Sequence, residues 1–208
     1  MLNLFSQNSR RNARKAAAKA AGYSFHTRLK NTGIRFGDFS LFQSSGSKEP
    51  VPSLSREATV LKNVWENDRN GMHILQFDYK AESPGGTGEA SKNYSVVHFK
   101  VDGLNLPAFQ LTQEDFFDQI GEFLGGDFQD IDFDDTPIFS SKYLLRGTDE
   151  TAIRTLFTPQ IRKTLEKLKG AHLEASGDEF LYYEERLIGN NEPELFIRLG
   201  ERLLGMFG

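Results

Sequence analysis

The residues best suited to chemistry form a run of aspartates in the middle of the chain. Asp130, Asp132 and Asp134 have the alternate spacing with which a calcium loop directs oxygen ligands at one hard cation. The match then fails, because the sixth position is Asp135 instead of glycine and the twelfth is a serine instead of a bidentate glutamate. A polar edge segment whose charges prevent unwanted strand pairing is the alternative. The missing ligands favour this alternative over a divalent-cation site.

Other catalytic patterns are absent from the sequence. The four histidines match no metal-binding spacing, although His73 and His98 fall on neighbouring predicted strands, where a facing pair would bind a metal or titrate near neutral pH. The absence of cysteine excludes disulfides and thiolate chemistry, and we find neither a nucleophile elbow nor a phosphate loop. We therefore predict a non-enzymatic interaction or scaffold module that needs no cofactor. A metal-dependent hydrolase using the carboxylates from Asp127 to Asp135 is the alternative.

Basic residues are concentrated near the N-terminus. The net charge is −4, yet residues 1–37 contain eight Lys or Arg residues and neither Asp nor Glu. The other 171 residues hold 17 basic and all 29 acidic residues. A basic end on an acidic body predicts an electrostatic contact, either with another surface or with the body itself.

Residues 9–21 are rich in Ala, Lys and Arg, which predicts a helix ending at Gly22. On a helical wheel the basic side chains cover one half and the alanines mostly the other. Near an anionic lipid leaflet each basic residue contributes about 1 kcal/mol of attraction. A helix docked on its own domain with a solvated basic face is the competing interpretation. The predicted contact residues are Arg10, Arg11, Arg14, Lys15 and Lys19.

The C-terminus is also a predicted contact region. Residues 192–207 predict a last helix, and Met206 and Phe207 place apolar side chains where terminal fraying would expose them. We predict that a protein partner or a second copy covers them, with docking on the chain's own sheet as the alternative. Nucleic acid is not an expected partner, because the acidic body would repel a duplex.

The elements that must position these residues form an α+β pattern. We predict an antiparallel sheet of six to eight strands with helices packed on one face, and a curved, pleckstrin-homology-like barrel as a variant. Residues 1–22 would form a basic helical arm and 23–208 a single domain, with any subdomain division near 103–126. Expected strands lie near 23–30, 34–41, 57–66, 72–81, 94–101, 137–146, 171–176 and 179–187, and further helices over 112–124, 149–157 and 159–169.

Location follows from what the sequence lacks. No apolar run is long enough to cross a bilayer, and no secretory signal is evident. We therefore expect a cytoplasmic protein, with the inner face of the membrane as a candidate site of contact.

Three segments resemble one group of bacterial proteins. They are Ile138-Phe-Ser-Ser-Lys-Tyr-Leu-Leu-Arg-Gly-Thr-Asp-Glu, Phe157-Thr-Pro, and Glu174-Ala-Ser-Gly-Asp-Glu-Phe-Leu-Tyr-Tyr. The group is known only as domains of unknown function that often follow membrane segments, and the resemblance covers roughly residues 70–208. It implies a bacterial, membrane-adjacent protein and supplies no residue roles. The present chain departs from the membrane-bound members in having no spanning helix.

Overall fold

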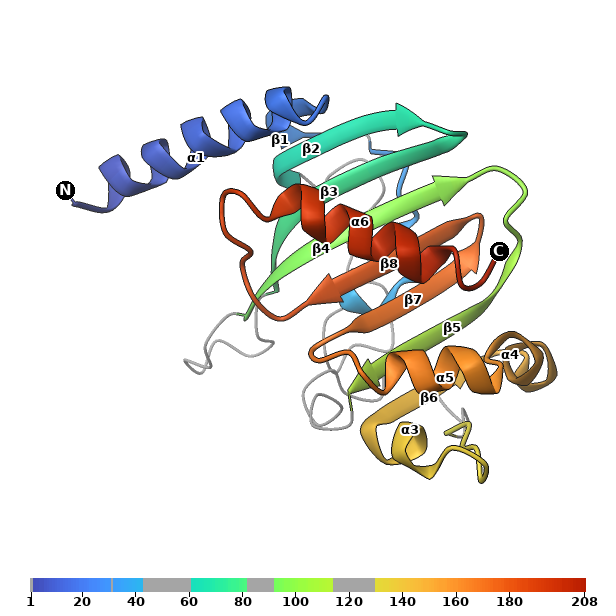
Figure 1. The fold of residues 1–208 in the computed structure, drawn as a ribbon. Coiled ribbons are helices and arrows are strands. Elements are labelled where there is room, and N and C mark those ends of the chain that lie inside the picture. Colours follow the sequence, from blue (N-terminus) through green and yellow to red (C-terminus); the bar gives the residue numbers. More distant parts are fainter. Residues whose placement is uncertain (1, 31, 43–60, 82–91, 114–129) are drawn as a thin grey trace.

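The computed structural model describes residues 2–30, 32–42, 61–81, 92–113 and 130–208. Within these ranges it contains one open, eight-stranded antiparallel sheet with the strand order β1-β2-β3-β4-β8-β7-β5-β6 (Figure 1). The strands are β1 (Ser24–Leu29), β2 (Leu61–Arg69), β3 (Met72–Ala81), β4 (Lys92–Val101), β5 (Leu106–Gln113), β6 (Tyr143–Gly147), β7 (His172–Gly177) and β8 (Glu179–Glu184). The helices are α1 (Leu2–Ala20), α3 (Pro137–Lys142), α4 (Glu150–Leu156), α5 (Pro159–Leu165) and α6 (Pro193–Leu204), with 3-10 turns η1 (Phe36–Asp38) and η2 (Ser40–Phe42).

Local sequence accounts for the tight turns and helix starts. Asn70 and Gly71 join β2 to β3 with φ angles of 52° and 74°, and a two-residue hairpin favours such left-handed residues. The Asp149 side chain caps α4 by accepting from the Ala152 amide. Thr158 caps α5, whose first turn contains Pro159. These features agree with the helices expected over 149–157 and 159–169 and with the separate strands expected near 57–66 and 72–81.

The sheet is apolar on both faces, so both faces are covered. In β8, Phe180 and Tyr182 face one buried cluster while Leu181 and Tyr183 face another. All five described α-helices contribute to the first cluster, and α6 lies across the middle of that face (Figure 1). Gly200 allows the close approach of α6, because a Cβ there would lie 2.8 Å from side-chain atoms of Val97 and Phe99.

The second face is covered by residues 34–42, which we call the strap. Phe36, Phe39 and Phe42 of the strap are buried against Phe77 of β3 and Leu181 of β8. Gly37 and Asp38 interrupt the alternation of apolar residues, and the chain forms two 3-10 turns here instead of the expected strand. The turns direct three phenylalanines onto one surface.

The predicted α+β class, antiparallel sheet and one-sided helices are confirmed, and the sheet is not closed into a barrel. Besides the strand expected near 34–41, two element assignments are wrong. The helix expected over 112–124 does not begin at Thr112, because this residue lies in β5, where it is paired with Leu144 of β6. Residues 137–142 form helix α3 instead of a strand, with Pro137 in its first turn. Residues 114–124 lie outside the described ranges. Among the described residues, no helix combines the length and apolar character that a bilayer crossing requires.

Candidate interaction site on helix α1

Helix α1 is held on the sheet by a buried arginine. Arg14 is 0% exposed, and its Nη1 donates to Oδ2 of Asp78 at 2.6 Å. Its Nη2 lies 3.4 Å from Oε1 of Gln76, which is also fully buried. Ala18, one turn further along, is buried in the same interface. The prediction that Arg14 contacts an external surface is therefore wrong, since its charge is used inside the fold.

The Asp78 carboxylate is the centre of this anchor. A bulge in β2, where Asn63 has a φ of 54°, lets the Asn63 amide donate to Oδ2 of Asp78 at 2.9 Å. Arg10 also lies near Asp78, at 3.9 Å, and donates to the carbonyl of Ile188 at 2.8 Å. Arg10, Arg14 and Ala18 follow one another at intervals of four residues, so one helix face points to the sheet.

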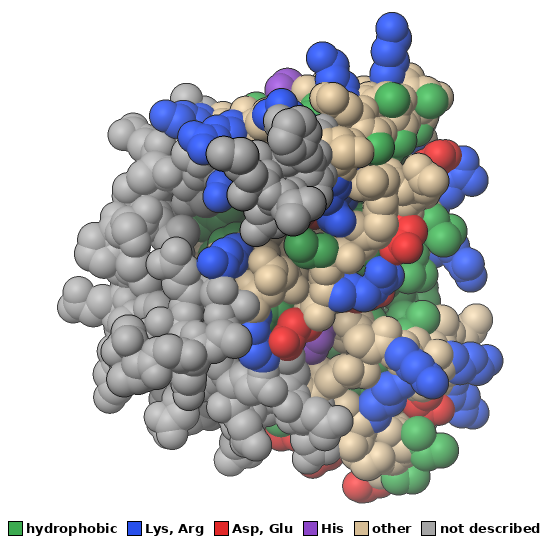
Figure 2. Space-filling model, turned by 90° about the vertical axis from the view of Figure 1, so that its left-hand side faces the viewer, with side chains coloured by type: hydrophobic (Ala, Val, Ile, Leu, Met, Phe, Trp, Pro, Cys, Tyr) green, Lys and Arg blue, Asp and Glu red, His purple; other side chains and the backbone are tan. Residues whose placement is uncertain are grey.

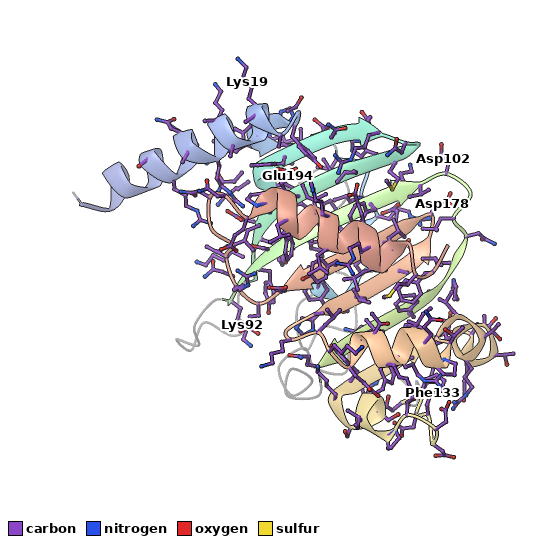
Figure 3. All side chains as sticks on the ribbon, viewed as in Figure 1. Lys19, Lys92, Asp102, Phe133, Asp178 and Glu194 are labelled. Carbon is purple, nitrogen blue, oxygen red and sulfur yellow. The ribbon has the colours of Figure 1, made fainter. Side chains whose placement is uncertain are left out.

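A row of cations, which we call the basic row, lies about 100° around α1 from the anchoring residues. Arg11, Lys15 and Lys19 are exposed and four residues apart, so they span about 12 Å along the helix. None of the three forms an ion pair with any described residue. Lys19 points away from the sheet in Figure 3. The anchor therefore fixes the direction of these charges.

The N-terminal half of α1 extends beyond the sheet (Figure 1). Figure 2 looks at the molecule from this side and shows several Lys and Arg side chains along the upper part of the surface, with others lower down. Two further cations lie on the sheet face that carries α1. Arg28 and Lys62 are exposed and directly opposite each other in the β1–β2 register, and Lys62 is opposite Asp78 in β3. The pairing of Lys62 with Asp78 is a favourable one, whereas Arg28 and Lys62 are like charges at paired positions.

The C-terminal residues are placed differently from the prediction. Phe207 is only 8% exposed, and its ring centroid lies 5.2 Å from Phe157 and 5.6 Å from Phe109. The expected fraying is absent, because this phenylalanine completes the core between the sheet and α4. Met206 is half-buried and lines an open groove together with Phe207.

The aspartates of the predicted metal site are dispersed among structural contacts. Oδ1 of Asp130 accepts from the Leu145 amide at 3.1 Å, and burial raises the pKa of this carboxyl. Asp132 and Asp134 are exposed. Asp135 forms a bidentate ion pair with Arg162, both distances being 2.6 Å. No three of the described His, Asp or Glu residues are grouped as a metal ion would require. Asp127 lies outside the described ranges.

The two histidines on neighbouring strands have separate partners. His73 Nδ1 lies 2.7 Å from Oδ1 of Asp68, whereas His98 is buried with Nε2 at 3.0 Å from Oε2 of Glu179. Burial lowers the pKa of His98, and the hydrogen bond to Glu179 opposes this shift only in part. The sheet therefore does not assemble the facing pair that the sequence allowed.

A polar cluster beneath the strap was missed by the sequence analysis. The buried carboxylate of Glu174 accepts from the Ser40 amide at 2.5 Å, the Ser40 hydroxyl at 2.7 Å, the Leu41 amide at 3.2 Å and the Tyr183 hydroxyl at 2.8 Å. Burial raises its pKa, and the hydrogen bonds from Ser40 and Tyr183 oppose that shift. The sequence signal for this buried carboxylate was a charged residue, Glu174, within an otherwise apolar strand pattern.

Glu179 fixes the other end of the strap. Its carboxylate accepts from the Arg35 amide at 3.1 Å and from Arg35 Nε at 2.7 Å. Burial of Glu179 would raise its pKa, but the hydrogen bonds from His98 and Arg35 lower it overall. The ionisable groups beneath the strap are thus bound to one another, whereas the basic row is not.

Comparison with known proteins identifies a fold and no family. No protein-family model matches the chain, and no curated protein matches it. The crystal structure of the mycobacterial trehalose monomycolate transport factor A, TtfA, is similar, with a TM-score of 0.59 over 95% of this chain and 92% of that chain. At 10% sequence identity the likeness shows a shared fold and assigns no residue roles.

Proposed function

We propose that this chain is a non-enzymatic interaction module that docks on an anionic membrane surface through the basic row of α1. The observation that carries the proposal is the orientation of α1. Arg14 is bonded to Asp78 at 2.6 Å beneath the helix, and this bond holds Arg11, Lys15 and Lys19 outward with no ion pair among the described residues.

The character of the outward face favours a lipid surface over a protein partner. The exposed α1 residues between positions 9 and 20 are small, polar or basic, and none is aromatic or a large aliphatic residue. Protein interfaces usually depend on buried aromatic or arginine anchors, whereas an anionic leaflet attracts Lys and Arg without a shaped pocket. The fold is shared with the mycobacterial trehalose monomycolate transport factor A, and a transport factor as structural neighbour supports a role in binding.

Vesicle binding tests the proposal. The intact chain should sediment with vesicles of phosphatidylglycerol and phosphatidylcholine at low salt, and much less at high salt or with phosphatidylcholine alone. The triple variant R11E/K15E/K19E should bind at least about 100-fold more weakly, because three attractions of about 1 kcal/mol each are lost.

A matched control separates local from global charge. K163E/K167E/K169E makes the same change of charge at exposed positions in and just after α5, and it should keep most of the vesicle affinity. Equal losses in the two variants would show that only net charge matters and would overturn the proposal. Binding to an acidic protein with no binding to anionic vesicles would replace the membrane with a protein partner.

A further inference from the structure

An open groove of about 760 Å³ lies between α4, α5, the start of β5 and the C-terminal residues. Figure 1 places these elements at the end of the molecule opposite the N-terminus of α1. Cavities of this size are typical of sites that bind small organic ligands. The groove is therefore independent of the basic row in position and in chemistry.

The groove is continuous with the hydrophobic core. Phe207 lines it and also contacts the core, since its ring lies 5.2 Å from Phe157 and 5.8 Å from Phe180. A half-buried methionine lies beside it. The apolar side chains of the lining are Pro107, Ala152, Leu156, Ile161, Met206 and Phe207.

Each hydroxyl group in the lining makes one hydrogen bond with its own helix. Thr155 Oγ1 donates to the carbonyl of Thr151, and Thr164 Oγ1 donates to the carbonyl of Gln160, both at 2.9 Å. Thr158 accepts from the amide of Ile161 as a helix cap. The side-chain amide of Gln160 is bonded to no other described residue, so it offers a neutral polar contact in the lining.

The lining contains no charged side chain, although 26% of the chain is Asp, Glu, Lys or Arg. An ionised ligand would lose its hydration there without gaining a counter-ion. An extended peptide would bring one backbone N–H and one C=O group with every residue, more than the three threonine hydroxyls and one side-chain amide of the lining can pair. A helix about 10 Å across would leave most of its surface outside a groove of this volume. A hydrocarbon chain has none of these requirements.

We propose that this groove binds one uncharged aliphatic chain, with a neutral hydroxyl head beside Gln160. The apolar floor would cover the chain, and the amide of Gln160 would bond the head. The inference rests on the groove alone and does not depend on membrane docking by α1.

Displacement of N-phenyl-1-naphthylamine, a neutral apolar fluorophore, tests the proposal on the full chain. We expect saturable binding of one probe per chain and displacement by 1-decanol. Decyltrimethylammonium and decanoate have the same chain length but a charged head, and should compete at least about tenfold less well. Equal competition by the three compounds, or no saturable binding, would overturn the proposal.

Variants of α4 locate the binding site. Ala152→Trp fills the groove and should weaken binding of the probe at least about tenfold, whereas Thr151→Trp adds the same ring at an exposed position outside the groove and should bind normally. If Ala152→Trp fails to fold, Gly205→Leu replaces it, because Gly205 is exposed and lines the groove; a Cβ there would lie 3.3 Å from the carbonyl oxygen of Glu201, which needs only a small local shift. Unchanged binding in a folded, groove-filled variant would contradict the assignment.

Discussion

The strap and helix α1 are each attached to the sheet by a buried charged side chain. The two attachments differ in how many of their buried polar atoms have hydrogen-bond partners. Under the strap, Glu174 receives four hydrogen bonds from Ser40, Leu41 and Tyr183. Under α1, Arg14 bonds Asp78, but Arg14 Nε and Asp78 Oδ1 are buried without a hydrogen-bond partner among the described residues.

This difference has an energetic meaning. A buried polar atom without a partner costs roughly 1–3 kcal/mol, so the α1 anchor is the less favourable of the two. The strap closes the second core, whereas α1 covers part of the first and projects beyond it. We conclude that the strap is a structural cover and that α1 is the segment more easily displaced.

Removing Glu174 should have the largest effect. Glu174→Ala leaves the amides of Ser40 and Leu41 and the Tyr183 hydroxyl without an acceptor, so we expect a loss of roughly 3–5 kcal/mol in the free energy of unfolding by urea. Glu174→Gln keeps one oxygen acceptor and should cost clearly less. Equal stability of the alanine variant and the unmodified chain would show that the strap is not held by this carboxylate.

Removing Arg14 should cost less and act on a different segment. Arg14→Ala leaves Asp78 with the Asn63 amide at 2.9 Å and Arg10 at 3.9 Å, and we expect a loss of roughly 2–3 kcal/mol in the free energy of unfolding. Amide hydrogen exchange should rise in residues 9–21 and stay unchanged in the strap. Faster exchange in both segments would contradict the independence of the two anchors.

A fall in pH should lower the stability of the fold through His172, which lies on the face of the sheet that the strap covers. Burial lowers the pKa of His172 to about 3, and its ring stacks on Tyr183 at 5.0 Å. The folded-state pKa lies below the unfolded value near 6.5, so the neutral, buried imidazole contributes its full stability only above about pH 6.5. This contribution is lost as the pH falls below that value. The loss from this residue between pH 7 and pH 5 should be roughly 2 kcal/mol.

Other groups modify that pH dependence. The lowered pKa of His98 acts in the same direction, whereas the raised pKa of Glu174 stabilises the fold as the pH falls. His172→Phe keeps an aromatic ring against Tyr183, so a flatter pH profile isolates the histidine. Identical profiles for the variant and the unmodified chain would refute this assignment.

The basic row should have the smallest effect on stability. R11E/K15E/K19E changes three exposed side chains with no ion pair among the described residues, so the free energy of unfolding should change by less than about 0.5 kcal/mol. Thermal and urea unfolding check this directly. A larger loss would mean that the row stabilises α1 on the domain, and the vesicle experiment would then need a different variant.

The sequence by itself determined the elements whose signals are local. Neighbouring residues specify each of these elements. The Asn70–Gly71 turn specifies a hairpin, the caps at Asp149 and Thr158 specify helix starts, and the alternation of residues specifies strand β8. Together these elements imply an antiparallel α+β fold, because strands joined by short turns must pair in opposite directions. The concentration of positive charge near the N-terminus is also a property of the sequence alone.

Only the tertiary structure decided what each charged or apolar residue does. Arg14 and Arg11 belong to the same basic stretch, yet one is buried against Asp78, 64 residues away, and the other faces outward. Glu174 meets Ser40 across 134 residues, and Phe207 closes the core instead of fraying. Such pairings depend on strand order and on which helix face meets the sheet. Composition and local periodicity do not indicate which residues so far apart in the chain will be in contact.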